Sequence, residues 1–132
     1  MTTTHPTVVY PEAVSDEAWD DPIRGKVSWR TLLSADRTPS EALTLGVAEV
    51  TRHGGGEFHL HRHAQAEAYY VLSGSGVLHV DGADYSLYPG VTAFIPGRAW
   101  HAARALGDEP LRLLYVFATD SFADVQYEFL VS

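Results

Sequence analysis

The sequence contains no cysteine, which excludes disulfide bridges and thiolate metal ligands. It is also short of basic residues: nine Lys and Arg stand against 17 Asp and Glu, giving a formal net charge of −8. A negative net charge disfavours binding to the phosphates of nucleic acids, so we expect no nucleic-acid partner. No apolar run reaches the roughly 18 residues of a membrane span, and the first residues lack the basic-then-apolar pattern of a signal peptide. We therefore expect a cytoplasmic protein that does not associate with membranes.

Long helical periodicity is also missing from the sequence. Short apolar segments instead follow one another at regular spacing, separated by turn signals such as Asp81-Gly82, the strongest hairpin signal in the chain. A length of 132 residues fits one domain. The pattern predicts a single all-β domain, either a β-sandwich or a β-barrel. The expected strands are 26–33, 43–50, 58–63, 68–72, 76–80, 84–87, 91–95, 101–105, 111–117 and 125–131.

The ends of the chain and one internal segment depart from this strand pattern. Residues 1–22 read as an N-terminal arm, and residues 23–132 as the barrel. Within the arm, residues 12–19 predict a short helix that Asp20-Asp21-Pro22 would end. The glycine-rich residues 53–56 predict a turn, because glycine weakens a strand interior. A helical turn is expected after Asp120.

Two histidines and a glutamate suit a metal site. His61 and His63 are two residues apart, so they share one face of a strand with Cα atoms about 6.6 Å apart. Imidazole nitrogens can converge on one ion from that separation, and Glu67 follows four residues later. A lone strand histidine is more often a hydrogen-bonded residue than a ligand, but this spacing favours a metal. His59 shares the same face of a regular strand, so spacing alone leaves the register open.

His101 is the other histidine with a place in this scheme. It follows a strand and a tight turn at Pro96-Gly97 that would return the chain to the sheet beside the first histidines. The remaining histidines have no partner at ligand spacing and are interpreted as structural or solvated; they are His5, His53 and His79.

These segments resemble the two motifs of the cupin superfamily. Residues 55–74 match the first motif: glycine, five residues, His-x-His, three residues, glutamate, six residues, glycine. Residues 90–101 match most of the second, although its internal glycine falls one place early at Gly97, Arg98 takes the usual glycine position, and Ala105 replaces a frequent asparagine. The resemblance implies a double-stranded β-helix, a jelly-roll barrel, with one metal-ligand set: His61, His63, Glu67 and His101.

A closer resemblance covers nearly the whole chain. The segments Val27-Ser-Trp-Arg, Leu43-Thr-Leu-Gly-Val-Ala-Glu, Ala66-Glu-Ala-Tyr and Tyr115-Val-Phe-Ala-Thr-Asp-Ser-Phe-Ala-Asp-Val-Gln-Tyr are similar to the small cupin-type dimethylsulfoniopropionate lyases. The resemblance implies that Tyr69 acts as the base and that Tyr127 is a second active-site tyrosine. The chain departs from that family in a longer, glycine-rich approach to the first motif and in His59.

The same residues define the expected chemistry. Three imidazoles and one carboxylate suit a divalent transition metal (Fe, Mn, Ni, Zn or Co), with open positions for a small carboxylate substrate. A cation near Tyr69 would provide the phenolate that removes an α-proton and expels a β-leaving group. Trp29 and Trp100 are candidates to face a sulfonium in the substrate pocket, beside His59, although core packing explains them equally well.

Two other functions fit the same ligand set. Cupin dioxygenases use it with a redox metal, and a non-catalytic cupin would bind only a metal or a small ligand. Oxygen-independent release of an alkene would separate a lyase from a dioxygenase. We also expect a symmetric homodimer.

Overall fold

The computed structural model describes residues 5–52 and 57–130, and in them almost all regular structure is β. Two short 3-10 turns are the exceptions, η1 (Pro11–Ala13) and η3 (Phe122–Asp124). The strands are β1 (Glu17–Asp21), β2 (Gly25–Leu33), β3 (Thr44–Val50), β4 (Glu57–Arg62), β5 (Glu67–Ser73), β6 (Gly76–Val80), β7 (Ala83–Leu87), β8 (Thr92–Ile95), β9 (His101–Ala105), β10 (Leu111–Phe117) and β11 (Glu128–Phe129).

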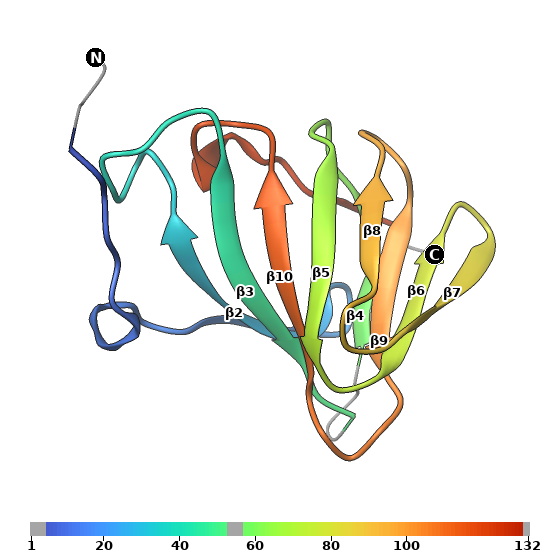
Figure 1. Ribbon diagram of the computed structural model, residues 1–132. Coiled ribbons are helices and arrows are strands. Elements are labelled where there is room, and N and C mark those ends of the chain that lie inside the picture. Colours follow the sequence, from blue (N-terminus) through green and yellow to red (C-terminus); the bar gives the residue numbers. More distant parts are fainter. Residues whose placement is uncertain (1–4, 53–56, 131–132) are drawn as a thin grey trace.

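The strands form one antiparallel sheet that curls into a jelly-roll barrel, as the sequence predicts. Its order is β7-β6-β9-β4-β2-β3-β10-β5-β8, with β1 added to β2 and β11 to β4. In Figure 1, β2, β3, β10, β5 and β8 form one wall, and the other strands lie beside and behind it. Alternate residues of β10 point inward and are buried, namely Leu111, Leu113, Tyr115 and Phe117. The barrel interior is therefore the hydrophobic core.

The predicted hairpin at Asp81-Gly82 is confirmed. The pairing of β6 with β7 ends with Val80 opposite Ala83, so Asp81 and Gly82 alone make the turn. Both have positive φ, 44° for Asp81 and 87° for Gly82. Positive φ at both central positions gives the turn whose twist matches the flanking strands, and it explains why glycine stands second.

The helix predicted for residues 12–19 is wrong. The chain makes η1 and then β1, which pairs with β2 along its whole length. Within β1, Trp19 is half-buried between the exposed residues Ala18 and Asp20, which is the two-residue period of a strand. The carboxylate of Asp21 accepts hydrogen bonds from the backbone amides of Ile23 and Arg24 and so forms the turn into β2. Strand β1 is thus part of the barrel sheet.

The C-terminal segment is irregular and crosses back toward β4. The expected helical turn is present as η3, where the Ser121 side chain accepts a hydrogen bond from the Ala123 amide. The strand expected over 125–131 is shorter, because only β11 pairs with β4. The turn expected at 53–56 and the final residue of that strand lie outside the described residues.

In the described ranges, 5–52 and 57–130, no helix is long and apolar enough to cross a membrane.

Candidate active site

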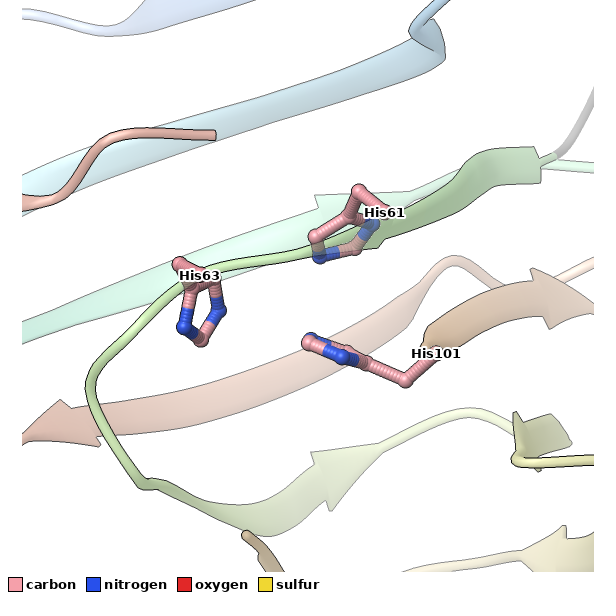
Figure 2. A group of neighbouring side chains, drawn as sticks. All are labelled: His61, His63 and His101. Carbon is pink, nitrogen blue, oxygen red and sulfur yellow. The ribbon is translucent and has the colours of Figure 1, made fainter. Parts of the chain in front are cut away.

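Three histidines meet inside the barrel. His61 lies on β4, His63 directly after it, and His101 opens β9, where it pairs with His61 across the two strands. The three residues are 1%, 3% and 1% exposed, in that order. One ring nitrogen from each lies within 4.8 Å of the others. Figure 2 shows the three rings turned toward one another. The sequence prediction that His101 returns to the first two is therefore confirmed.

Backbone carbonyls fix which nitrogen of each ring is protonated. The three Nδ1 atoms lie 2.7–2.9 Å from carbonyl oxygens, so each Nδ1–H donates and each Nε2 keeps its lone pair. The acceptors are the carbonyls of His59 for His61, Gln65 for His63 and Ala99 for His101. Histidine ligands of metal ions are commonly oriented by such a second hydrogen bond. The rings are thus presented as three Nε2 ligands.

Glu67, the first residue of β5, completes the cluster. It is 4% exposed, and its Oε1 lies 3.2 Å from His63 Nε2 and 3.3 Å from His101 Nε2. The Nε2 atoms of His61 and His101 are buried, and no described residue forms a hydrogen bond with either. A carboxylate and three unprotonated nitrogens are all electron-pair donors, so their mutual approach needs a positive charge between them. A divalent metal ion fits this set of residues.

Burial keeps His61 neutral. Removal from water lowers the pKa of its imidazole well below the usual 6.5, and the nearby His101 and His63 lower it further. Neutral imidazole is the form that binds metals.

A β-bulge in β4 removes His59 from this face. Phe58 pairs with Ala103 and His61 with His101, and the register shifts between them. Phe58 and His61 both point inward, so the expectation that His59 shares the face of His61 is wrong. The His59 side chain is 37% exposed, and its Nδ1 lies 3.2 Å from the Ile23 carbonyl. In a β-bulge, two residues of one strand lie opposite a single residue of its partner, and this reverses the inward and outward alternation of the side chains that follow.

A cavity adjoins the metal-ligand cluster and shares Glu67 with it. Its empty volume is about 350 Å³, counting the space that is open to solvent. Three of the candidate residues line it, namely Tyr69, Tyr127 and Trp29. The other lining residues are Trp19, Val27, Ala48, Phe58, Tyr115 and Phe122. The walls are therefore largely aromatic.

Both expected active-site tyrosines have raised pKa values. For Tyr69, burial raises the pKa well above 10, and the Glu67 carboxylate raises it further. Burial also dominates the raised pKa of Tyr127, followed by Glu67. Tyr127 is half-buried, whereas Tyr69 is only 4% exposed. The protein groups alone thus keep both phenols protonated, and only an added cation would favour phenolate.

Two of the three expected pocket residues lie outside the cavity. Trp100 precedes the inward-facing His101 and points the opposite way, where its ring packs under the Arg62 guanidinium at 4.5 Å. The other is His59, which the bulge turns outward. The sequence analysis missed Tyr115 and Trp19, although Tyr115 pairs directly with Tyr69 and a strand-pairing argument would have found it.

The comparisons with known proteins agree with this geometry. The family model described as "Cupin domain" matches residues 48–117, which span β4, β5 and β9 with all four candidate ligands. The chain belongs to the cupin family. It is 37% identical to dimethylsulfoniopropionate lyase DddW of Ruegeria pomeroyi over 127 residues, covering 96% of this chain and 82% of that protein.

Two further proteins are similar to this chain. The 5-nitrosalicylic acid 1,2-dioxygenase of Bradyrhizobium sp is 39% identical over 64 residues, which cover 48% of this chain and 30% of that protein. The solved cupin-2 domain Rru_A2000 of Rhodospirillum rubrum is 25% identical, with a TM-score of 0.74 over 100% of this chain and 84% of that one.

The departure from the second cupin motif has a structural counterpart. Arg98, at the usual glycine position, has a φ of 67°, in the left-handed region that favours glycine. Its backbone amide donates to the His63 carbonyl at 2.7 Å. The preceding Gly97 packs so closely that an added Cβ would lie 2.3 Å from the Ala64 oxygen. This turn therefore ties the segment before His101 to the segment after His63.

Proposed function

We propose that this cupin is a metal-dependent carbon–sulfur lyase that converts dimethylsulfoniopropionate to acrylate and dimethyl sulfide. The observation that carries the proposal is the position of Tyr69 in a cavity that adjoins the histidine cluster and shares Glu67 with it. The similarity to the Ruegeria lyase, which extends over 96% of the chain, supports the same reaction.

His61, His63, Glu67 and His101 are proposed to hold one divalent ion of Fe, Mn, Ni, Zn or Co. When bound, such an ion supplies the positive charge that favours phenolate in the cavity and withdraws charge from a nearby carboxylate. The ligand set does not distinguish among these metals, because occupancy follows availability as much as ligand type.

Tyr69 is the proposed base. Its phenolate oxygen takes the proton from the α-carbon, and the electron pair of that C–H bond becomes the new double bond of acrylate. The β-carbon–sulfur bond breaks with its pair leaving on sulfur, so the sulfonium departs as neutral dimethyl sulfide. The elimination consumes no oxidant or reductant. Tyr127 lines the same cavity and is proposed to act beside Tyr69 on the same substrate.

The aromatic walls suit the cationic end of this substrate. A sulfonium is attracted to the faces of aromatic rings, and the effect grows in a site that excludes water. Trp19 and Trp29 pack edge to face with ring centroids 4.9 Å apart, and Phe122 lies 6.1 Å from Trp29. These rings are therefore proposed to receive the dimethylsulfonium group.

The test is an assay of the metal-loaded protein with dimethylsulfoniopropionate under nitrogen. Dimethyl sulfide would be measured by gas chromatography and acrylate by liquid chromatography, and both should appear in equal amounts. Activity only in the presence of oxygen would overturn the lyase proposal in favour of a dioxygenase. No turnover of either kind would favour the non-catalytic alternative. A homodimer and a cytoplasmic location stay predictions, which light scattering and cell fractionation would test.

A further inference from the structure

The stretch of chain that supplies three of the four candidate ligands also holds the segment of Tyr127. Residues 61–67 carry these ligands at buried positions, and two residues between them, Arg62 and Gln65, contact the C-terminal segment. Figure 1 shows that segment, in red, passing behind β5 on its way from η3 to β11. Neighbours of the ligands thus join the metal-ligand cluster to the segment of Tyr127.

Gln65 makes one contact through its backbone and another through its side chain. Its backbone carbonyl lies 2.9 Å from His63 Nδ1, and its side-chain Nε2 donates to the Asp124 carbonyl at 3.2 Å. Since a carbonyl only accepts hydrogen bonds, the side-chain amide must present its nitrogen to Asp124. A change of the Gln65 side chain should therefore release Asp124 and leave the orientation of His63 intact.

Arg62 holds the same segment on the other side of Tyr127. Its Nε donates to Glu128 Oε2 at 2.5 Å, and the two residues are opposite each other in the pairing of β4 with β11. The link to Asp124 lies three residues before Tyr127, and the link to Glu128 lies one residue after it. The tyrosine is therefore held from both sides.

Between the two links, the ring of Tyr127 lies beside the rings of two ligands. Its centroid is 5.4 Å from that of His61 and 5.3 Å from that of His63. The ring also packs edge to face on Trp19 at 5.0 Å and lines the cavity. Residues 125–127 belong to neither a helix nor a strand. Strand pairing therefore does not fix the position of Tyr127, and the two links do.

We propose that Arg62 and Gln65 are positioning residues of the elimination, because they keep Tyr127 against the metal-ligand cluster. The inference rests on the proposed function, in which Tyr127 acts beside Tyr69 on the substrate. Arg62 and Gln65 do not line the cavity, so both act through residues 124–128 rather than on the substrate. A displacement of about 1 Å at a reacting group can cost about a hundredfold in rate.

The first measurement is hydrogen exchange at the Val125 amide, followed by NMR on the zinc-loaded protein. This amide belongs to the same peptide group as the Asp124 carbonyl and donates to the Phe122 carbonyl at 3.0 Å. Gln65→Met keeps the length of the side chain and removes the donor. A hydrogen bond changes an equilibrium by a factor of about 2–10, so exchange at Val125 should become faster by that factor.

Arg62→Met removes the second link and should also speed exchange at Val125. Gln126→Met is the matched control, since Gln126 is exposed and directly precedes Tyr127. It should leave the exchange rate unchanged. An unchanged rate in both Arg62→Met and Gln65→Met would refute the inference.

The second measurement is a double-mutant cycle on the turnover of dimethylsulfoniopropionate. Gln65→Met should lower kcat at least about threefold in the parent. In a Tyr127→Phe background it should add almost nothing, because the hydroxyl that it positions is already gone. An equal loss in both backgrounds would indicate a general structural role and would overturn the inference.

Metal content separates the two contacts of Gln65. It should be the same in Gln65→Met as in the parent, since the carbonyl that orients His63 is part of the backbone. A loss of metal would show that the side chain acts on His63 and would contradict the inference. The exchange measurement needs no substrate. A parent that releases no dimethyl sulfide, but whose exchange responds as expected, would refute the lyase proposal and leave the two links to the segment of Tyr127 standing.

Discussion

The ring of Phe58 stacks on the ring of His61, with centroids 4.0 Å apart and an angle of 17° between the planes. Residues three apart on a regular strand point to opposite faces, so this contact exists only because β4 carries a bulge between them. The bulge therefore joins the aromatic cavity wall to the metal-ligand cluster.

Phe58 should be important for stability. It is 9% exposed and packs on Trp19 as well as on His61. Phe58→Ala should lower the free energy of unfolding by about 3–5 kcal/mol, measured by urea denaturation. Phe94, 72% exposed on β8, provides the control, and its change to Ala should alter stability by about 0.5 kcal/mol or less. Equal losses in the two variants would contradict the described core.

Removal of one histidine ligand should empty the metal site. We expect His101→Ala to weaken metal binding by at least about tenfold, because the loss of a direct ligand exceeds that of an orienting partner. Metal content would be measured by mass spectrometry after dialysis. His79→Ala is the control, since His79 is bonded to Asp84 on the outside of the barrel. A His101→Ala protein with full metal content would refute the site.

His59 should be dispensable for both metal and turnover. From sequence alone we expected it to affect substrate binding, but the bulge turns its side chain toward the Ile23 carbonyl. His59→Ala should therefore retain metal and bind acrylate with the parent's affinity. A loss of metal equal to that of His63→Ala would show that the register of β4 is different.

Tyr69 should carry the largest effect on the proposed elimination. Tyr69→Phe removes the base and leaves the ring in the barrel wall, so turnover should fall about 10²- to 10⁴-fold. Metal content and thermal stability would be measured on the same preparation and should stay close to the parent's. Tyr127→Phe is the comparison variant. If it loses that much while Tyr69→Phe does not, the base is Tyr127.

The ion pair of Glu17 and Arg37 should make stability depend on pH in the acid range. Arg37 Nη1 donates a hydrogen bond to Glu17 Oε2 at 2.7 Å. Among the influences on Glu17, this hydrogen bond is the largest, and it lowers the pKa of the carboxyl below its ordinary value of 4.5. A carboxyl with a lowered folded-state pKa stabilises the fold above its unfolded pKa, and the contribution is lost as pH falls through the folded value.

Glu17→Gln should therefore reduce the free energy of unfolding at pH 7 by about 1 kcal/mol or less, since the pair is partly exposed. The difference from the parent should shrink as pH falls below about 4.5. Glu12→Gln, an exposed change in η1, should show no such trend. A constant difference down to pH 3 would contradict the lowered pKa.

Local spacing was enough to predict most of the strands, whereas the choice of ligands among the histidines needed the resemblance to the cupin motifs. The two-residue period and the turn signals are properties of a few neighbouring residues, and His61, Glu67 and His101 occupy fixed places in two motifs. The side-chain direction of His59 depends on a bulge, which arises from pairing with β9 forty residues later. Within residues 12–19, the pairing of β1 with β2 is a tertiary contact, and it overrides the local preference for a helix. Tyr115 was missed for a similar reason, since only the registers of β3 and β5 place it in the cavity.

The sheet order gives the metal site a second consequence. Strands β9 and β4 are neighbours, but β2, β3 and β10 stand between β4 and β5, the strand of Glu67. The four candidate ligands thus come together only after the sheet has closed, and an unfolded chain offers no comparable site. An ion that binds only the closed barrel adds stability by mass action, about 2.7 kcal/mol at a hundredfold excess over its dissociation constant. The melting temperature should accordingly rise with free metal concentration, and a chelator should shorten the lifetime of the folded barrel.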